Sequence, residues 1–401
     1  MKKKSLLIIT FMASFLLCLT PCVSHAQDVE LGAYGKAAQK QYSIANSKIV
    51  AVSATADSSA INRALSSAKA KASVSSKAMV YIPAGNHKMN GVVNVPANVV
   101  MASEKQAFFY GRPGEKMVTI SGSVYGGTFD GGKAVRQIFW FNYEKFSNAN
   151  GEVRKAVIKN ATVDGIHYGS SVNRKALGGA KAIGNVITNC HNGITAAYSG
   201  SYSLISGNTI SKIGTGKEGS GINITHANVS TISNNKISNT KGHGISTETD
   251  LPVGSFQRKI VIKTISGNTI SNTGTHGIWV DNKVTIKSVK KNTIKKSNMC
   301  GIAIEKQGVI NALDNNTITG CKQSNITMNG EKSKLTVGSG NIITKSKSIG
   351  IMVSGKATLV IKGKNNIIKN NKNDIRVLKS KKAKFKLKNK KKNKIPNIRI
   401  V

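Results

Sequence analysis

Apolar residues in the second half of the chain recur in pairs spaced two apart, and each pair follows a small residue at a turn. Ile278 and Val280 form one such pair, and Ile302 and Ile304 form the next. A spacing of two is the period of a β-strand, so both members of a pair lie on the same face. No window of eleven residues in this region carries a helical stripe. We therefore expect short strands whose Ile and Val side chains point inward.

The pattern recurs at a nearly fixed step, most often of 23 to 25 residues. The small turn residues are Gly221, Gly244, Gly277, Gly301, Asn325 and Gly350, and a second series with the same step is Asn235, Asn268, Asn292, Asn316, Asn341 and Asn366. A period of this length indicates a solenoid in which neighbouring repeats bury each other's apolar faces. We expect parallel strands stacked about 4.8 Å apart, with the Asn side chains forming a ladder along one corner.

The units NTISNTGTHGIWVDN, NTIKKSNMCGIAIEK and NTITGCKQSNITMNG, within residues 268–330, resemble the repeats of right-handed parallel β-helix proteins of the pectate-lyase-like superfamily. The resemblance implies an all-β fold, a single-stranded right-handed parallel β-helix, which we place at residues 79–378. Residues 108–185 are less regular, and we expect loops there to carry His167 and Tyr168. This superfold hosts lyases, hydrolases, epimerases and inert adhesins, so it implies an architecture and not one activity.

Residues 1–26 are predicted to be a secretory signal peptide. Three lysines precede an apolar run, and Ser24-His25-Ala26 suits cleavage after Ala26. Lipidation at Cys22 is an alternative that Pro21 makes a poor match. The apolar run is too short to span a membrane, and no later segment approaches about 20 apolar residues. We expect a secreted, extracellular protein, either free or retained at the cell surface.

Residues 27–78 are expected to form an N-terminal extension followed by a capping helix. The first part, 27–56, is polar and rich in small residues, which favours an extension or linker. The next stretch places apolar residues at helical spacing, with Asp57 or Ser58 positioned to cap the first turn. An amphipathic helix here can close the open end of the solenoid, which would otherwise expose its core and strand edges.

The chain is strongly basic, with 59 Lys and Arg against 17 Asp and Glu and a net charge of +42. Lysines are dense in the tail at 379–401, where Ala383, Phe385 and Leu387 alternate with lysines and predict a last edge strand. A basic surface attracts polyanions. For an exported protein we expect the partner to be an acidic polysaccharide or an anionic cell envelope. We expect no nucleic-acid partner and a monomeric state.

Three cysteines remain after signal cleavage: Cys190, Cys300 and Cys321. An odd and sparse set argues against a disulfide framework in a secreted chain. Either one bridge or buried free thiols is expected.

Acidic residues are scarce, and three of them fall at the same position of successive repeats. Glu248, Asp281 and Glu305 are each the fourth residue after the turn residue, so strand alternation predicts an outward-facing ladder. Carboxylates about 5 Å apart repel, so at least one pKa should rise. The ladder is expected to be either a Ca²⁺ site, which needs six to eight oxygens, or an acid/base set. The rung spacing of about 5 Å suits a retaining glycosidase.

Several further residues are candidates for the same site. His243 and His276, before successive turn glycines, are candidate catalytic residues, and Trp279 offers a flat face for a sugar ring. The remaining candidate substrate contacts are His226, Arg258 and Lys283. The segment KGHGIST resembles the Gly-His-Gly segment of polygalacturonases and so nominates His243, but the paired aspartates of that family are missing from SGINIT at 220–225. Lysines beside the ladder offer a purely structural alternative, in which they pair with the acids.

Two functions are compatible with these features. The first is a carbohydrate-active protein, a lyase or glycosidase, that acts on a uronate-containing polysaccharide. The second is a non-catalytic protein that binds the cell wall or cell surface, with the solenoid as a rigid spacer.

Overall fold

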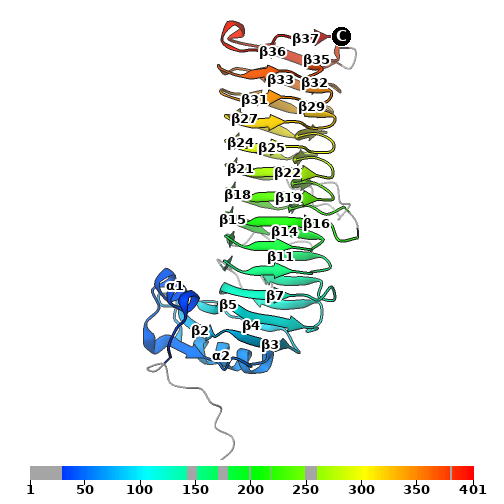
Figure 1. The fold of residues 1–401 in the computed structure, drawn as a ribbon. Helices are drawn as coiled ribbons and strands as arrows, with labels where there is room; N and C mark the ends of the chain where they lie inside the picture. The colour runs from blue at the N-terminus through cyan, green and yellow to red at the C-terminus, as the bar shows by residue number, and fades with distance from the viewer. Residues whose placement is uncertain are drawn as a thin grey trace, which may run out of the picture.

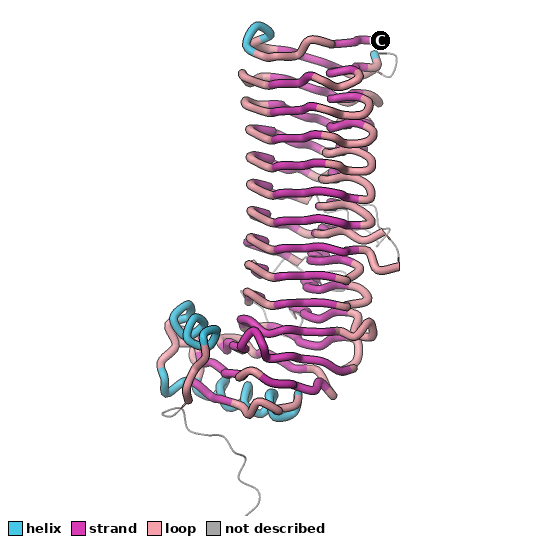
Figure 2. Tube along the Cα trace, viewed as in Figure 1, coloured by secondary structure: helices cyan, strands magenta, loops and turns pink. Residues whose placement is uncertain are grey.

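The computed structural model describes residues 29–141, 151–169, 179–197, 200–216, 218–248, 260–379 and 382–401. The coils stack into one elongated column, with the helices α1 and α2 at its N-terminal end and the C-terminus at the other (Figure 1). The same alternation of strand and turn repeats from coil to coil along the column (Figure 2). The fold is a right-handed parallel β-helix, which confirms the architecture predicted from the repeats.

Each regular coil contributes three strands, and each strand pairs in parallel with its counterparts in the coils before and after it. Within the described residues this gives one 24-stranded sheet, sheet A, with two columns of strands, and one 13-stranded sheet, sheet B.

The first column of sheet A consists of β1 (Ile49–Ala51), β2 (Ala78–Ile82), β5 (Val99–Gly111), β7 (Ser123–Asp130), β9 (Glu152–Arg154), β12 (Ala180–Ile183), β15 (Ser201–Ser206), β18 (Asn228–Ser233), β21 (Val261–Ser266), β24 (Thr285–Lys290), β27 (Val309–Asp314), β30 (Lys334–Val337), β33 (Thr358–Ile361) and β36 (Lys384–Leu387). The second column consists of β3 (Gly85–Met89), β10 (Val157–Lys159), β13 (Val186–Thr188), β16 (Thr209–Ile213), β19 (Lys236–Thr240), β22 (Thr269–Thr273), β25 (Thr293–Lys295), β28 (Thr317–Thr319), β31 (Ile342–Thr344) and β34 (Ile367–Lys369). The long strands β5 and β7 pair with strands of both columns.

Sheet B consists of β4 (Val93–Val95), β6 (Lys116–Ile120), β8 (Gln137–Phe141), β11 (Asp164–Gly169), β14 (Asn192–Ala197), β17 (Ile222–Thr225), β20 (Ile245–Glu248), β23 (Ile278–Val280), β26 (Ile302–Glu305), β29 (Ser324–Asn329), β32 (Ile349–Val353), β35 (Asn373–Val377) and β37 (Ile398–Ile400).

The register of sheet B stacks like residues on like residues. Ile278 pairs with Ile245 in the preceding coil and with Ile302 in the next one. These side chains, and Val280 and Ile304, are fully buried. The inward orientation predicted from the spacing of two is therefore confirmed, and the core is a continuous row of β-branched side chains along the axis.

The predicted asparagine ladder is also confirmed. The side-chain Nδ2 and the backbone N–H of Asn268 both donate to Oδ1 of Asn292, each at 2.9 Å, and Nδ2 also donates to the Ile232 carbonyl at 3.0 Å. Asn235 makes the matching contacts to Asn268 from the preceding coil. These side chains are buried, and the ladder supplies the hydrogen bonds that buried amides need.

The turn glycines are required because successive coils approach each other closely. A Cβ added to Gly277 would lie 2.5 Å from the Gly301 carbonyl oxygen and 2.5 Å from Cγ2 of Ile294. Gly165, Gly193 and Gly244 show equally close approaches to the next coil. The glycine register therefore extends two coils further toward the N-terminus than Gly221.

The helix α2 (Ser58–Lys71) closes the N-terminal end of the column (Figure 1), as predicted. Its N-cap is Asp57, whose side chain accepts from the backbone N–H of Ala60 at 2.8 Å. Ile61 and Leu65 are buried in the main core. The cap thus covers apolar surface that the first coil would expose.

The expectation of an extension or linker at 27–56 was wrong for residues 29–56. This segment contains α1 (Ala33–Tyr42), a 3-10 turn η2 (Asn46–Lys48) and β1. The buried Glu104 of β5 accepts from the backbone N–H of Gly35 at 2.8 Å and so holds α1 against the column. Helix α1 is short and built of small and polar residues, and it therefore lacks the apolar stripe that identified α2.

The lysine-rich C-terminal segment completes the column. The predicted edge strand is β36, which pairs with β33, and it is followed by η4 (Lys390–Lys392) and by β37, which pairs with β35. The three cysteines are buried free thiols, one of the two alternatives expected. Within the part of the chain that the structure describes, no helix is long and apolar enough to cross a membrane.

Candidate functional site

The acidic ladder occupies three successive coils at the end of the sheet B strands. Glu248 ends β20 and pairs with Thr225, while Glu305 ends β26 and pairs with Asn329. Asp281 is the first residue after β23. The three acids lie in successive coils, as the repeat register predicted. They differ, however, in how far their side chains are exposed.

Asp281 does not point outward into solvent, which corrects the prediction from alternation. Its residue exposure is 1%, whereas Glu248 and Glu305 are half-buried. The alternation rule holds only inside a strand, and β23 ends at Val280. The chain then turns, with the N–H of Val284 donating to the Asp281 carbonyl at 3.2 Å. A carboxyl group buried this deeply cannot contact a polysaccharide as a nucleophile.

The electrostatics of Asp281 follow from this burial. Burial raises the pKa of Asp281 to about 6, and repulsion from Glu305 and Glu248 raises this pKa further. A hydrogen bond from the Asn282 backbone acts in the opposite direction and lowers it. Lys306 Nζ lies 3.6 Å from Oδ2 of Asp281. The predicted rise of one ladder pKa is confirmed. The lysine pairing that offered a structural explanation is also present, for this one acid.

Trp279 is the centre of a compact aromatic group. Its indole lies parallel to the His243 ring, with centroids 4.7 Å apart and an interplanar angle of 10°. The His243 and His276 rings are stacked as well, with centroids 5.4 Å apart. Trp279 Nε1 donates to Oε2 of Glu305 at 3.2 Å. The structure therefore brings Trp279, both candidate histidines and one ladder acid together, and the indole is half-buried.

Both histidines of this group are neutral at physiological pH. Burial lowers the pKa of His243 to about 3, with a further contribution from His276, and burial lowers the pKa of His276 to about 4. Nδ1 of His276 accepts from the Cys300 backbone N–H at 3.2 Å, and Nδ1 of His243 lies 3.0 Å from the Thr275 hydroxyl. Groups with such low pKa values are weak bases near pH 7. Their geometry suits stacking and hydrogen bonding better than proton abstraction.

The other predicted substrate contacts are less well placed. His226 is buried, with 7% exposure, and lies just after β17 in a left-handed conformation. Lys283 is half-buried in the turn that follows Asp281. Arg258 lies outside the described residues. Of the three, Lys283 is the one that the structure places beside the ladder and partly in solvent.

The Ca²⁺ expectation gains no support. Within the described ranges, no group of three or more His, Cys, Asp or Glu side chains is arranged to hold a metal ion. For the ladder itself, Asp281 is buried while Glu248 and Glu305 are half-buried.

A second polar group, not selected from the sequence, lies on the same sheet nearer the N-terminus. Asp164 and His167 of β11 are joined by a 2.7 Å contact between Oδ2 and Nδ1. Thr195 and Asn192 of β14 donate to Oδ1 of Asp164 at 2.6 and 3.1 Å. Burial alone would raise the pKa of Asp164, but hydrogen bonds led by that of His167 outweigh it and lower this pKa. Asp164 is therefore an anion with 2% exposure.

An aromatic ring and a cation complete this group. Trp140 of β8 pairs in register with His167, and the two rings meet edge to face with centroids 6.0 Å apart. Lys116 Nζ of β6 lies over the Trp140 ring. His167 and Tyr168 were expected in a loop, and the structure places both in β11.

The signal that would have found this group was present in the turn-glycine register. Read upstream, Gly165 is a turn glycine, Asp164 precedes it and His167 is second after it, just as His276 and Trp279 flank Gly277. The segments DGIH and HGIW therefore occupy the same position in their coils. The irregular spacing of residues 108–185 hid this register.

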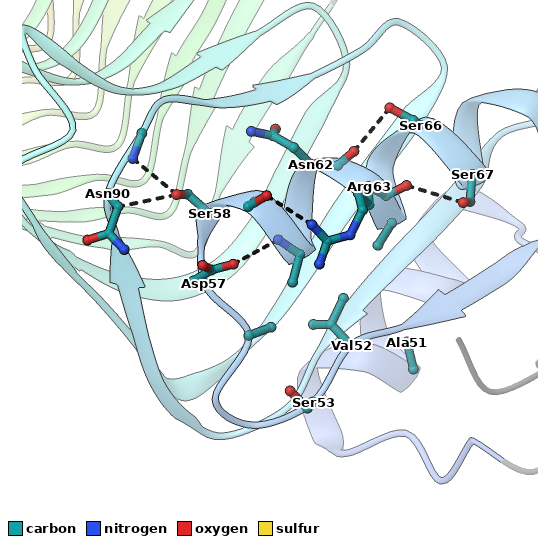
Figure 3. A pocket seen from close by; sticks show the side chains of 15 residues that line it. Ala51, Val52, Ser53, Asp57, Ser58, Asn62, Arg63, Ser66, Ser67 and Asn90 are labelled. Carbon is teal, nitrogen blue, oxygen red and sulfur yellow. Dashed lines mark hydrogen bonds between the residues drawn. The ribbon is translucent and has the colours of Figure 1, made fainter. Parts of the chain in front are cut away.

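A pocket of about 950 Å³ lies elsewhere, beside α2 (Figure 3). Its small polar side chains are engaged locally: Ser58 accepts from the backbone of Asn90 and Gly91, and Arg63 donates to Ser59. Asp57 acts as the helix cap there. The pocket brings together no acid/base pair among its lining residues.

Two family models match parts of the chain. The model described as right handed beta helix region matches residues 257–397, and the model described as periplasmic copper-binding protein (NosD) matches residues 139–252. No curated protein matches the chain by sequence. Each model covers less than half of the chain, so together they support the repeat architecture.

Solved structures share the fold at low sequence identity. The A-module of the Azotobacter vinelandii mannuronan C-5 epimerase AlgE4 has a TM-score of 0.60 at 13% identity, covering 89% of this chain and 99% of that one. The Dettilon tailspike protein has a TM-score of 0.56 at 14% identity, covering 92% and 73%. The periplasmic alginate epimerase AlgG has a TM-score of 0.50 at 11% identity, covering 100% of both chains. At these identities the similarity shows the β-helix fold alone.

Proposed function

We propose that this chain is an exported carbohydrate-active protein that binds a uronate-containing polysaccharide along the outer face of sheet B and acts on it as a lyase. The observation that carries the proposal is the group formed by Trp279, His243 and Glu305. A half-buried indole whose face is held by a stacked ring and whose N–H is fixed by a carboxylate is a pre-organised platform for a sugar ring.

The charge distribution supports an acidic polymer as the ligand. The net charge of +42 attracts polyanions. Lys306 is exposed over 55% of its side chain and stands beside the ladder, where it can meet a uronate carboxylate while Glu305 accepts from a hydroxyl. By their titles, one structure that shares this fold is a mannuronan C-5 epimerase and another is an alginate epimerase, which agrees with a polyuronate ligand.

The buried position of Asp281 favours elimination over hydrolysis. A retaining glycosidase needs two carboxyl groups that both reach the glycosidic bond, and Asp281 is 1% exposed. A lyase needs one base near the ring and a cation at the uronate carboxylate. A lyase therefore does not require two exposed carboxyl groups in the ladder.

Incubation of the mature protein with pectate, alginate and glycosaminoglycans tests the proposal. We expect new ultraviolet absorbance from an unsaturated product. Reducing ends without absorbance would indicate a glycosidase instead.

A non-catalytic binding protein is the second candidate, and the same burial of Asp281 favours it. In that case the polymer binds, but neither ultraviolet absorbance nor reducing ends increase. Retention should then weaken steeply with salt, because the lysines make most of the contact energy.

A further inference from the structure

The two polar groups of sheet B lie on one row of paired residues, in which Thr195 and Ser246 are buried. His167 pairs with Thr195, Thr195 with Asn223, Asn223 with Ser246, and Ser246 with Trp279. His167 and Trp279 are thus four rungs apart, about 19 Å along the axis.

The environment of His167 differs from that of the stacked histidines His243 and His276. Nδ1 of His243 contacts the Thr275 hydroxyl and Nδ1 of His276 accepts from the Cys300 backbone, whereas Nδ1 of His167 contacts the buried anion Asp164 at 2.7 Å. The neighbours of Asp164 in its column are Gln137 and Asn192, both neutral amides. In β11, the carboxylate of Asp164 therefore lies in the same coil as His167, the histidine of this row.

This contact determines which ring nitrogen is available. Because Asp164 accepts the Nδ1 proton, Nε2 is the basic nitrogen of the neutral ring. The His167 side chain is 16% exposed, so part of the ring is accessible. Trp140 on the preceding rung meets His167 edge to face, and the Lys116 ammonium lies over the Trp140 ring.

We propose that His167 is the general base of the proposed lyase, with Asp164 as its positioning residue and, as its substrate, a uronate ring whose carboxylate pairs with Lys116. The inference rests on the proposed function. Nε2 of His167 takes the proton from C5, next to the uronate carboxylate. The electron pair of that C–H bond forms the C4–C5 double bond, and the C4–O bond breaks. The departing oxygen takes up a proton from the imidazolium or from water.

The test compares His167→Gln with His191→Gln, a matched change at a half-buried histidine outside this row. Each protein is incubated with alginate and pectate in D₂O, and unsaturated product and deuterium at C5 of the uncleaved polymer are followed, together with binding of the polymers. We expect His167→Gln to lower the elimination and exchange rates by at least about 100-fold, with affinity changed less than twofold and the melting temperature preserved. His191→Gln should behave as the unchanged protein does.

Asp164→Asn tests the positioning role. It should lower kcat while leaving KM close to its original value, because the ring keeps its place but faces a neutral amide, which can donate as well as accept, in place of the carboxylate that fixes its tautomer. A change in KM alone would indicate a structural role only.

The inference is overturned if His167→Gln retains the original turnover, or if the unchanged protein binds the polymers but shows neither exchange nor elimination at C5. The second result leaves polysaccharide binding intact. If none of the polymers binds, the proposed function itself fails, so the two failures can be told apart.

Discussion

Trp279 lies flat against His243 of the preceding coil, with ring centroids 4.7 Å apart and planes 10° from parallel. The two residues are 36 positions apart in sequence and meet only because one coil lies directly over the next. The stack fixes the indole on the outer face of sheet B. It also keeps His243 neutral, because the burial that it brings lowers the histidine pKa.

Replacement of Trp279 is expected to weaken polysaccharide binding. Trp279→Ala should reduce affinity about 30-fold, equivalent to about 2 kcal/mol for an aromatic anchor, and Trp279→Phe should lose less because a ring face remains. Titration calorimetry with polyuronates checks this. Equal affinity of Trp279→Ala and the unchanged protein would place the ligand elsewhere.

Asp281 is expected to make the protein less stable as the pH rises. Its folded pKa of about 6 exceeds the ordinary value of 3.8, so the stabilisation is complete below about pH 4 and is lost as the pH rises through 6. Asp281→Asn should therefore be more stable than the unchanged protein at pH 8, by on the order of 2 kcal/mol. Denaturant melts at pH 4 and pH 8 measure the difference. Glu331→Gln, at an exposed carboxyl, is the control and should show no such gain.

The stacked histidines are expected to act in the opposite direction. Their folded pKa values, about 3 and 4, lie below the ordinary value of 6.5, so the unfolded chain binds protons first as the pH falls. Stability should drop between pH 6.5 and pH 4. In His243→Gln/His276→Gln the drop should be smaller by on the order of 6 kcal/mol at pH 4. Thermal melts across this range measure the drop, with His191→Gln as control. Equal losses of stability in the unchanged protein, the double variant and His191→Gln would contradict the role of the two stacked histidines.

The asparagine ladder is expected to be essential for stability. Asn268→Ala removes the acceptor used by Asn235 and leaves the Ile232 carbonyl without its side-chain donor, all in a buried corner. The cost should be about 2–4 kcal/mol, since several buried polar groups lose partners at once. Asn311→Ala, at an exposed position in β27, should cost less than about 0.5 kcal/mol. Comparable losses in the two variants would show that the ladder contributes nothing special.

The repeat pattern alone was enough to predict the architecture. Ile278 and Val280 could be assigned to the core because every strand in a solenoid obeys the same period of two, and neighbouring coils enforce it. The Asn ladder followed from the same step. The cap helix α2 was predictable from Asp57 at its N-cap and from the apolar residues at helical spacing that follow. Helix α1 was not predictable, because it has no such apolar stripe and is held by Glu104 of a distant strand.

The sequence by itself determined the β-helix, its inward residues, the asparagine corner and the column of acids, since each depends on a local period that repeats. Only the tertiary structure decided what the acids and histidines can do. Strand β23 ends one residue before Asp281, so strand alternation does not predict the orientation of Asp281, which is buried. Asp164 and His167 are three residues apart, which alternation would place on opposite faces, yet they touch, and the pairing of β11 with β8 and β14 skips Gly165 between them. Burial and corner geometry arise from the packing of successive coils, and these set the pKa values and contacts on which any chemistry depends.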